Sequence, residues 1–250
     1  MNSGDSIRME KVCYSVGGRK ILQDFDFCLD RGINRTILGI SGVGKTTILK
    51  LLLGLLKPNS GMVFIGDLCI TNLPESRFTQ QRKRIAIVFQ GGALFDSMTV
   101  GENVGYRLFE EGRLSLAEIE AIVLEKLGFV GVEAALDLYP AELSGGMKKR
   151  VAIARALAAD PDYIFFDEPT TGLEPIGVYN ICSLIQRLQA EGKTTLLVTH
   201  DLATAFATSQ RFTFLHKAQM LFEGSEEGMR DSLIPEVREF LEPTDKSLFV

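Results

Sequence analysis

The sequence predicts an α/β domain that carries an inserted α-helical lobe. Apolar runs typical of buried strands recur along the chain, for example at residues 163–166. A glycine-rich loop at residues 39–47 joins one such run to a helix-like segment. Between residues 98 and 159 the apolar side chains follow helical spacing, and no strand of comparable quality occurs there.

Two strand-like runs open the chain. Residues 7–14 alternate as a half-buried strand does, and a pair of glycines at 17–18 marks the turn into a second run at 21–29. Tyr14 therefore falls near the end of an early strand. Its ring either packs on the core or stacks on an adenine, and the second interpretation depends on the motifs that follow.

The glycine-rich loop has the composition of a phosphate cradle. Glycines permit backbone angles that turn successive N–H groups towards one anion, and the following helix presents the positive end of its dipole. Lys45 adds a mobile charge for the β- and γ-phosphates, and the Thr46 hydroxyl is suited to ligate Mg²⁺. A purely structural glycine turn is the alternative. The predicted phosphate-binding residues are Gly39, Ser41, Gly42, Val43, Gly44, Lys45, Thr46 and Thr47.

Beyond this loop a strand leads to a candidate ligand residue. Residues 47–57 are expected to form a helix, residues 73–84 a short basic helix, and residues 85–89 a buried strand. Gln90 follows that strand at once, where side chains in α/β sheets point towards the ligand-binding crevice. The apolar side chains at 91–98 are either core contacts or a partner-facing patch.

A second anion-facing helix start lies within the helical lobe. Ser144, Gly145 and Gly146 stand at the head of an alanine-rich helix. One chain rarely needs two cradles for the same phosphate. This motif is therefore interpreted as a contact to the nucleotide that is bound by a second copy of the chain.

Polar residues end two further parallel-type strands. Asp167 and Glu168 follow the run at 163–166, and burying such a pair is costly unless it has chemical work. Asp167 can hold Mg²⁺, directly or through water, and Glu168 can accept a proton from an attacking water. His200 ends the run at 193–199. A histidine there is commonly structural, but beside a phosphate cradle it is assigned a γ-phosphate contact.

The end of the chain and its composition complete the prediction. Strands are expected at 211–216 and 219–223, an acidic turn at 224–228, and a helix at 235–241. The net charge of −5 over 250 residues argues against a nucleic-acid partner. We expect no secretory signal and no membrane span, and the four scattered cysteines indicate reduced thiols.

These motifs stand in the order and approximate spacing of the ABC-type ATPase subunit, which the chain resembles over residues 7–225. The resemblance implies a P-loop NTPase fold: a RecA-like, mostly parallel sheet with an antiparallel β subdomain and an inserted helical lobe. The ATPase domain would span residues 1–225. Its RecA-like core would lie at about 1–90 and 159–225, with the lobe at about 91–158, and residues 226–250 would form a C-terminal helix and tail.

The resemblance also implies ligands and residue roles. In that family two ATP molecules are sandwiched between two subunits, and the Ser-Gly-Gly motif of one faces the phosphate loop of the other. ATP and Mg²⁺ are the implied ligands. Lys45, Thr46 and Asp167 would hold the triphosphate and the metal, and Gln90 would sense the metal and the attacking water. Glu168 would be the general base, His200 would contact the γ-phosphate, and Tyr14 would stack on the adenine. Ser144, Gly145 and Gly146 would act in trans.

Two positions depart from the usual pattern of the family. Met147 stands where most members have Gln, and Glu174 stands where the pattern has Asp. We expect ATP binding to survive the first change, because the helix start is kept. The second adds a methylene at a carboxylate of the dimer interface and bears on closure and on the rate of hydrolysis.

The chain is also similar to the ATPases of Mla/Mce-type lipid transporters in several short stretches. These are the Ser-Gly-Gly-Met motif, the basic helix start after it, and the segments at 88–98 and 235–241. The match implies a homodimeric, ATP-hydrolysing subunit, peripheral on the cytoplasmic face of the inner membrane. Its partners would be permease subunits and an Mce-type lipid-binding protein. The alternative is a soluble ABC ATPase of a cytosolic assembly machine, such as metal-cluster biogenesis. A non-enzymatic scaffold is disfavoured because Glu168 and His200 are both present.

Overall fold

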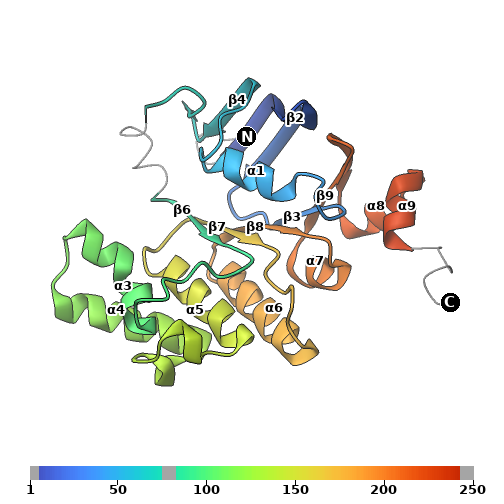
Figure 1. The fold of residues 1–250 in the computed structure, drawn as a ribbon. Coiled ribbons are helices and arrows are strands. Elements are labelled where there is room, and N and C mark those ends of the chain that lie inside the picture. The colour runs from blue at the N-terminus through green and yellow to red at the C-terminus, as the bar shows by residue number, and fades with distance from the viewer. Residues whose placement is uncertain (1–5, 75–82, 243–250) are drawn as a thin grey trace. The chain divides into compact units, whose positions relative to one another are not determined.

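The computed structural model describes residues 6–74 and 83–242. These residues form two compact units, one made of 6–74 with 196–242 and the other of 83–195 (Figure 1). The short basic helix expected at 73–84 lies largely outside the described residues. The predicted boundaries of the RecA-like core and of the helical lobe stay a prediction.

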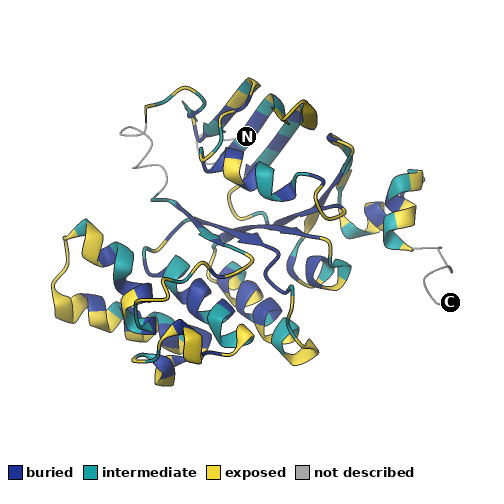
Figure 2. Ribbon diagram, in the orientation of Figure 1, coloured by how far each residue is buried: buried dark blue, intermediate teal, exposed yellow. Residues whose placement is uncertain are grey.

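The first unit contains a four-stranded antiparallel sheet in the order β2-β1-β4-β5. One face of this sheet is buried, because apolar side chains alternate with polar ones along the strands (Figure 2). The helix α1 contacts β1 and β4. The bounds are β1 Ser6–Val16, β2 Arg19–Asp30, β4 Ser60–Ile65, β5 Leu68–Cys69 and α1 Lys45–Leu52.

Helix α1 is shorter than the sequence predicted. It ends at Leu52 instead of continuing to Lys57. Gly54 takes a left-handed φ of 62°, and its N–H donates to the carbonyl of Leu51, so the chain turns one residue after the helix cap at Leu53.

Parallel pairing supplies the second sheet of the first unit. The buried strand β3, Arg35–Leu38, pairs in parallel with residues 196–199 of β8, whose full bounds are Thr194–Thr199, and with β9, Arg211–His216. Strand β9 then pairs in antiparallel fashion with β10, Gln219–Gly224. The phosphate loop begins directly after β3, so its first residue follows a buried strand.

Three helices complete this unit: α7 Leu202–Thr208, α8 Glu226–Arg230 and α9 Pro235–Leu241. They pack on β3 and β9 in one apolar cluster that includes Leu38, Phe214 and Val237. The predicted acidic turn at 224–228 was wrong, because residues from 226 onwards form α8. Ser225 caps that helix by accepting from the N–H of Gly228 at 3.2 Å, and acidic residues fill its first turn.

The second unit pairs β6, Ile85–Val88, in parallel with β7, Tyr163–Asp167. Helix α5 contacts β6 and packs on α3, α4 and α6. The structure describes every residue from 98 to 159 and has no strand there, as predicted. The helices are α3 Val100–Glu111, α4 Leu116–Val130, α5 Gly145–Leu157 and α6 Pro175–Ala190, with short 3-10 turns η2 Glu133–Ala135 and η3 Pro140–Glu142.

The helices α3 and α4 have well-defined ends. Thr99 and Ser115 each form a capping box with a glutamate three residues later, and Gly112 and Gly131 close the helices in left-handed conformations. No helix among the described residues is both long enough and apolar enough to cross a bilayer.

Candidate functional site

The phosphate loop needs glycine for two separate reasons. Gly42 and Gly44 have φ values of 76° and 118°, which side chains rarely tolerate. A Cβ on Gly44 would also lie 2.7 Å from Cγ2 of Ile21. A Cβ on Gly39 would lie 2.5 Å from the carbonyl oxygen of Leu215. The loop is therefore packed closely against neighbouring strands at Gly39 and Gly44.

Lys45 lies inside this loop. Its side chain is buried, and Nζ donates to the carbonyls of Gly39 at 2.7 Å and Ile40 at 3.2 Å. Gly44 is the N-cap of α1 and takes a left-handed conformation, so the first turn of the helix follows the glycine loop directly. Thr46, in that first turn, is half-buried. The arrangement fits a triphosphate, which needs N–H donors and a cation at one point.

Tyr14 lies on the buried side of the antiparallel sheet. It pairs with Leu22 on β2, and directly opposed residues share one face. Leu22 is buried, whereas Tyr14 is half-exposed. Tyr14 therefore shares the buried face of the sheet and keeps part of its surface exposed.

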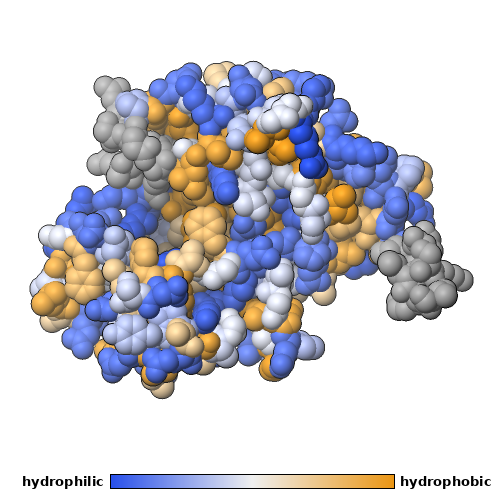
Figure 3. Space-filling view, viewed as in Figure 1, coloured by the Kyte–Doolittle hydropathy of each residue, from blue (hydrophilic) through white to orange (hydrophobic). Residues whose placement is uncertain are grey.

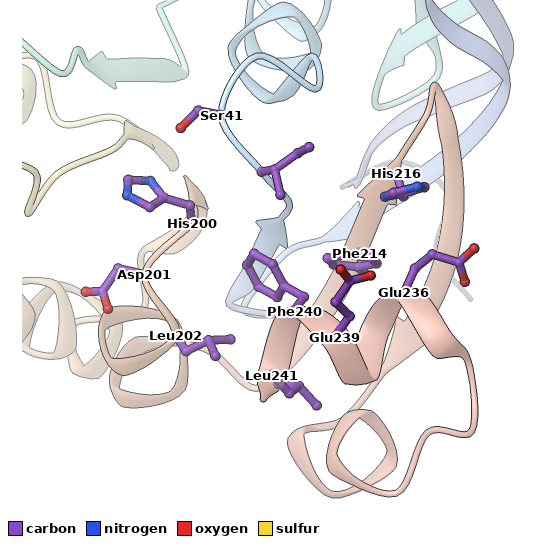
Figure 4. A pocket seen from close by; sticks show the side chains of 11 residues that line it. Ser41, His200, Asp201, Leu202, Phe214, His216, Glu236, Glu239, Phe240 and Leu241 are labelled. Carbon is purple, nitrogen blue, oxygen red and sulfur yellow. The ribbon is translucent and has the colours of Figure 1, made fainter. Parts of the chain in front are cut away.

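His200 and the phosphate loop line the same cavity, whose volume is about 1200 Å³. Asp201 fixes this point of the chain, because its carboxylate accepts from the N–H groups of Ala203 and Thr204 at the start of α7. Figure 4 shows the exposed imidazole of His200 and the Ser41 hydroxyl at one end of the cavity. Side chains of α9 line the other end.

In the second unit, β6 and β7 place Gln90 and Glu168 at the same edge. The last paired positions are Val88 and Phe166, and each predicted site residue lies two residues beyond. Gln90 is exposed, whereas Asp167 and Glu168 are buried. The structure thus confirms that two adjacent carboxylates are buried at the end of a central strand.

Glu168 has an uncommon backbone conformation. Its φ is 48°, which is rare for a residue with a side chain and is frequent at functional sites. Its carboxylate accepts from the Thr171 hydroxyl at 3.3 Å. Its carbonyl accepts from Nζ of Lys149 at 3.2 Å, and Lys149 also donates to the carbonyl of Gln90.

Sequence reasoning did not find Lys149, although it contacts two predicted site residues. Burial lowers the pKa of Lys149, and the nearby charges of Asp167 and Glu168 oppose that shift. A signal was present in the sequence. Lys149 precedes the buried Ala152 and Ile153 by three and four residues, which places it on the buried face of α5.

The Ser-Gly-Gly motif begins α5 on an open surface. Ser144 is the helix cap, and its hydroxyl accepts from the N–H of Met147 at 3.3 Å, so the helix start survives the methionine. A Cβ on Gly145 or Gly146 would meet nothing within 4 Å. The motif shares a cavity of about 360 Å³ with Glu174, the cap of α6.

Among the described residues, no three His, Cys, Asp or Glu side chains gather as a metal cage. Mg²⁺ commonly binds through one or two carboxylates together with substrate phosphates. Thr46 carries a hydroxyl and Asp167 a carboxylate, which are oxygen donors of the kind that Mg²⁺ prefers.

The sequence profile of the ABC transporter family matches residues 22–171. This chain belongs to the ABC transporter family. It is 37% identical over 237 residues to the intermembrane phospholipid transport system ATP-binding protein MlaF of Escherichia coli K12, covering 94% of this chain and 88% of MlaF. It is 35% identical over 239 residues to the probable ribonucleotide transport ATP-binding protein mkl of Mycobacterium bovis, covering 95% of this chain and 67% of mkl.

A solved ABC cassette confirms the fold class. The dimeric cassette MJ0796, bound to ADP and Pi in a post-hydrolysis state, superimposes with a TM-score of 0.81 at 32% identity, covering 88% of this chain and 98% of that one. The predicted P-loop NTPase fold is therefore correct. As a member of this family the chain is an ATP-binding, ATP-hydrolysing cassette.

Proposed function

We propose that this ABC ATPase drives the movement of phospholipid between membranes. The observation that carries the proposal is the likeness to MlaF, a phospholipid transport protein, along nearly the whole chain. The methionine that ends the Ser-Gly-Gly motif and the helix at 235–241 agree with it. The relatives named above are transport proteins, which favours a transporter over a soluble assembly ATPase.

The working form is a homodimer with two composite ATP sites. The space around Gly145 and Gly146 supports this proposal: a Cβ there would meet nothing within 4 Å, so this helix start can meet the nucleotide of a second copy. A related cassette is itself dimeric. Ser144, Gly145 and Gly146 therefore act in trans.

Phosphoryl transfer requires mostly positioning and charge neutralisation. The phosphate loop from Gly39 to Thr47 binds the phosphates, Lys45 neutralises them, and the ring of Tyr14 stacks on the adenine. Thr46, Asp167 and Gln90 would hold Mg²⁺, which would neutralise charge on the phosphates. Glu168 is the general base for water, and His200 contacts the γ-phosphate.

The membrane partners contact the segment after Gln90. Phe95 in that segment is 42% exposed, which is unusual for a phenylalanine and fits a hydrophobic partner helix. Those partners are permease subunits, together with an Mce-type lipid-binding protein. The ATPase itself is peripheral, on the cytoplasmic face of the inner membrane, and has no nucleic-acid partner.

A transfer assay tests the proposed substrate. The ATPase is co-purified with its permease subunits and reconstituted into liposomes, and ATP-dependent transfer of a fluorescent phospholipid to acceptor liposomes is measured. Glu168→Gln is the control, because losing the general base slows hydrolysis by about 10²- to 10⁴-fold. We expect transfer to require ATP and to be lost in Glu168→Gln.

Two results would contradict this proposal. One is ATP-dependent movement of a ribonucleotide without movement of phospholipid, which would favour the function that the name of mkl gives. The other is phospholipid transfer that continues at the wild-type rate in Glu168→Gln.

A further inference from the structure

Helix α5 carries two cationic side chains that reach the backbone of the segment after β6. Lys149 donates to the carbonyl of Gln90. Arg155 donates to the carbonyls of Gly92 at 3.0 Å and Ala93 at 2.8 Å. The helix that begins with the Ser-Gly-Gly motif therefore anchors this segment at the carbonyls of Gln90, Gly92 and Ala93.

Lys149 alone of these two also reaches Glu168. Its Nζ donates to the Glu168 carbonyl at 3.2 Å, and its side chain is only 7% exposed. One ammonium group thus joins three parts of the second unit: α5, the end of β6 and the end of β7. Strand pairing brings both carbonyls to the same edge of the sheet.

A positive charge at this point is costly to bury. A methionine of similar length would fill the space without the loss of hydration. The charge is compensated by the two carbonyls and by the nearby carboxylates. The function of Lys149 therefore depends on the hydrogen bonds that its ammonium group donates, and not on the volume of its side chain.

The target of the bond is the residue with the uncommon backbone. Glu168 has a φ of 48°, and such a conformation persists only where the surroundings fix it. A hydrogen bond to the Glu168 carbonyl restrains the peptide plane that follows this residue. The direction of the Glu168 side chain depends on the same backbone angles.

We propose that Lys149 is a positioning residue, which fixes the backbone of Glu168 relative to Gln90 and so makes hydrolysis depend on the segment that meets the permease. The inference rests on the proposed roles of Gln90 and Glu168. When the segment after Gln90 shifts, Lys149 and Arg155 carry the shift to α5 and to the Glu168 peptide. Lys149 itself touches no substrate.

Steady-state ATPase kinetics of the full-length chain test this proposal. Lys149→Met should lower kcat by about 10- to 100-fold, which is the loss expected from misplacing a reacting group by roughly an ångström. KM for ATP should change less than about 3-fold, because the phosphate loop is unaltered. Lys149→Arg keeps the donors and should recover most of kcat.

Two controls separate positioning from folding. Lys148→Met changes the neighbouring, half-buried lysine of the same helix and should leave kcat and KM unchanged. Lys149→Gln keeps a neutral donor and serves where Lys149→Met does not fold, as judged by thermal unfolding. It should give a kcat between those of the Arg variant and Glu168→Gln.

The double variant Lys149→Met, Glu168→Gln distinguishes the possible failures. If Lys149 acts through Glu168, the double variant should hydrolyse ATP within about 2-fold of Glu168→Gln. Three results would overturn the inference. The losses of kcat could be additive in the double variant. The changes of kcat and KM could be equal, without recovery in Lys149→Arg, or kcat could equal that of wild type in both Lys149→Met and Lys149→Gln. Wild-type hydrolysis in Glu168→Gln alone would instead overturn the proposed role of Glu168.

Discussion

Phe95 is an exposed side chain that its neighbours hold in place. Its ring packs against that of Tyr106, with centroids 4.8 Å apart, and the Arg155 guanidinium lies 5.6 Å from its centre. The buried Asn103 accepts from the N–H of Phe95 and donates to its carbonyl and to that of Met98. A rigid, exposed aromatic ring favours the partner-facing interpretation of this segment over core packing.

Phe95→Asp should uncouple transport from hydrolysis. A carboxylate in a hydrophobic interface pays a desolvation cost, so the complex should weaken while the catalytic residues stay in place. We expect basal ATPase activity of the isolated chain within about 2-fold of wild type. Phospholipid transfer by the reconstituted complex should fall by at least about 10-fold.

Leu116→Asp is the matched control for Phe95→Asp. Leu116 is 73% exposed at the start of α4, where hydrophobic residues lie among hydrophilic ones (Figure 3). Its charge variant should leave transfer intact if the effect is specific to Phe95. Loss of folding in Phe95→Asp would show that the ring belongs to the core.

At the scale of elements, the β-bulge in β1 decides which face Tyr14 occupies. Strand β1 has an extra residue between Met9 and Val12, and β2 has one between Leu22 and Phe25. Ile7, Met9, Val12 and their partners on β2 are buried. Strict alternation from Ile7 would put Tyr14 on the opposite face, and the bulge in β1 returns it to the buried one.

Each bulge is satisfied by a side chain of the facing strand. The N–H of Lys11, whose φ is 48°, donates to the Asp26 carboxylate at 2.9 Å. The N–H of Asp24, whose φ is 47°, donates to Sγ of Cys13 at 3.3 Å. On the other side of β1, a Cβ on Gly61 would lie 2.3 Å from the Lys11 carbonyl oxygen, so only glycine fits.

Asp26→Ala should therefore weaken the binding of ATP, because it disturbs the contact that Tyr14 makes with the adenine base. The Lys11 N–H would lose its acceptor, the Asp26 carboxylate, so the bulge would be less stable. If Tyr14 then points elsewhere, its stacking on the adenine is lost, which should lower the affinity for ATP roughly 2- to 10-fold. Inorganic triphosphate should bind as before, because the phosphate loop is unchanged. Calorimetric titration with both ligands measures the difference.

Asp30→Ala, at the exposed end of β2, is the control for Asp26→Ala and should bind both ligands normally. Equal weakening of ATP and triphosphate would mean that the bulge supports the phosphate loop rather than the adenine. Unchanged ATP binding would mean that Tyr14 does not depend on the bulge.

The bulges also show what sequence patterns can and cannot predict. The alternation of apolar and polar residues predicted β1 and β2. It did not predict the bulges, because an extra polar residue within a strand does not stand out from its polar neighbours. The motif residues were found because phosphate chemistry restricts residue types at short spacing. Lys149 was missed because a lysine in a basic run is usually solvated, and its burial depends on contacts distant in sequence.

At the scale of the whole molecule, the proposed site residues are divided between the two units. The phosphate loop, Tyr14 and His200 belong to the first unit. Gln90, Asp167, Glu168 and the Ser-Gly-Gly motif belong to the second. On the proposed mechanism, hydrolysis requires both units and a second copy of the chain.

Mixing two inactive variants tests the composite site most directly. Lys45→Ala removes the cation of the phosphate loop, and Ser144→Arg blocks the Ser-Gly-Gly helix start. Each variant alone should lose hydrolysis, because both sites of its homodimer carry the same defect. A mixed dimer has one site with both defects and one site with neither.

The ATPase rate is measured as the two variants are combined in equal amounts. We predict that activity returns to about a quarter of the wild-type rate per chain, since half of the randomly formed dimers are mixed and each has one intact site. If mixing restores no activity, or if either variant alone hydrolyses ATP normally, the Ser-Gly-Gly motif does not act in trans.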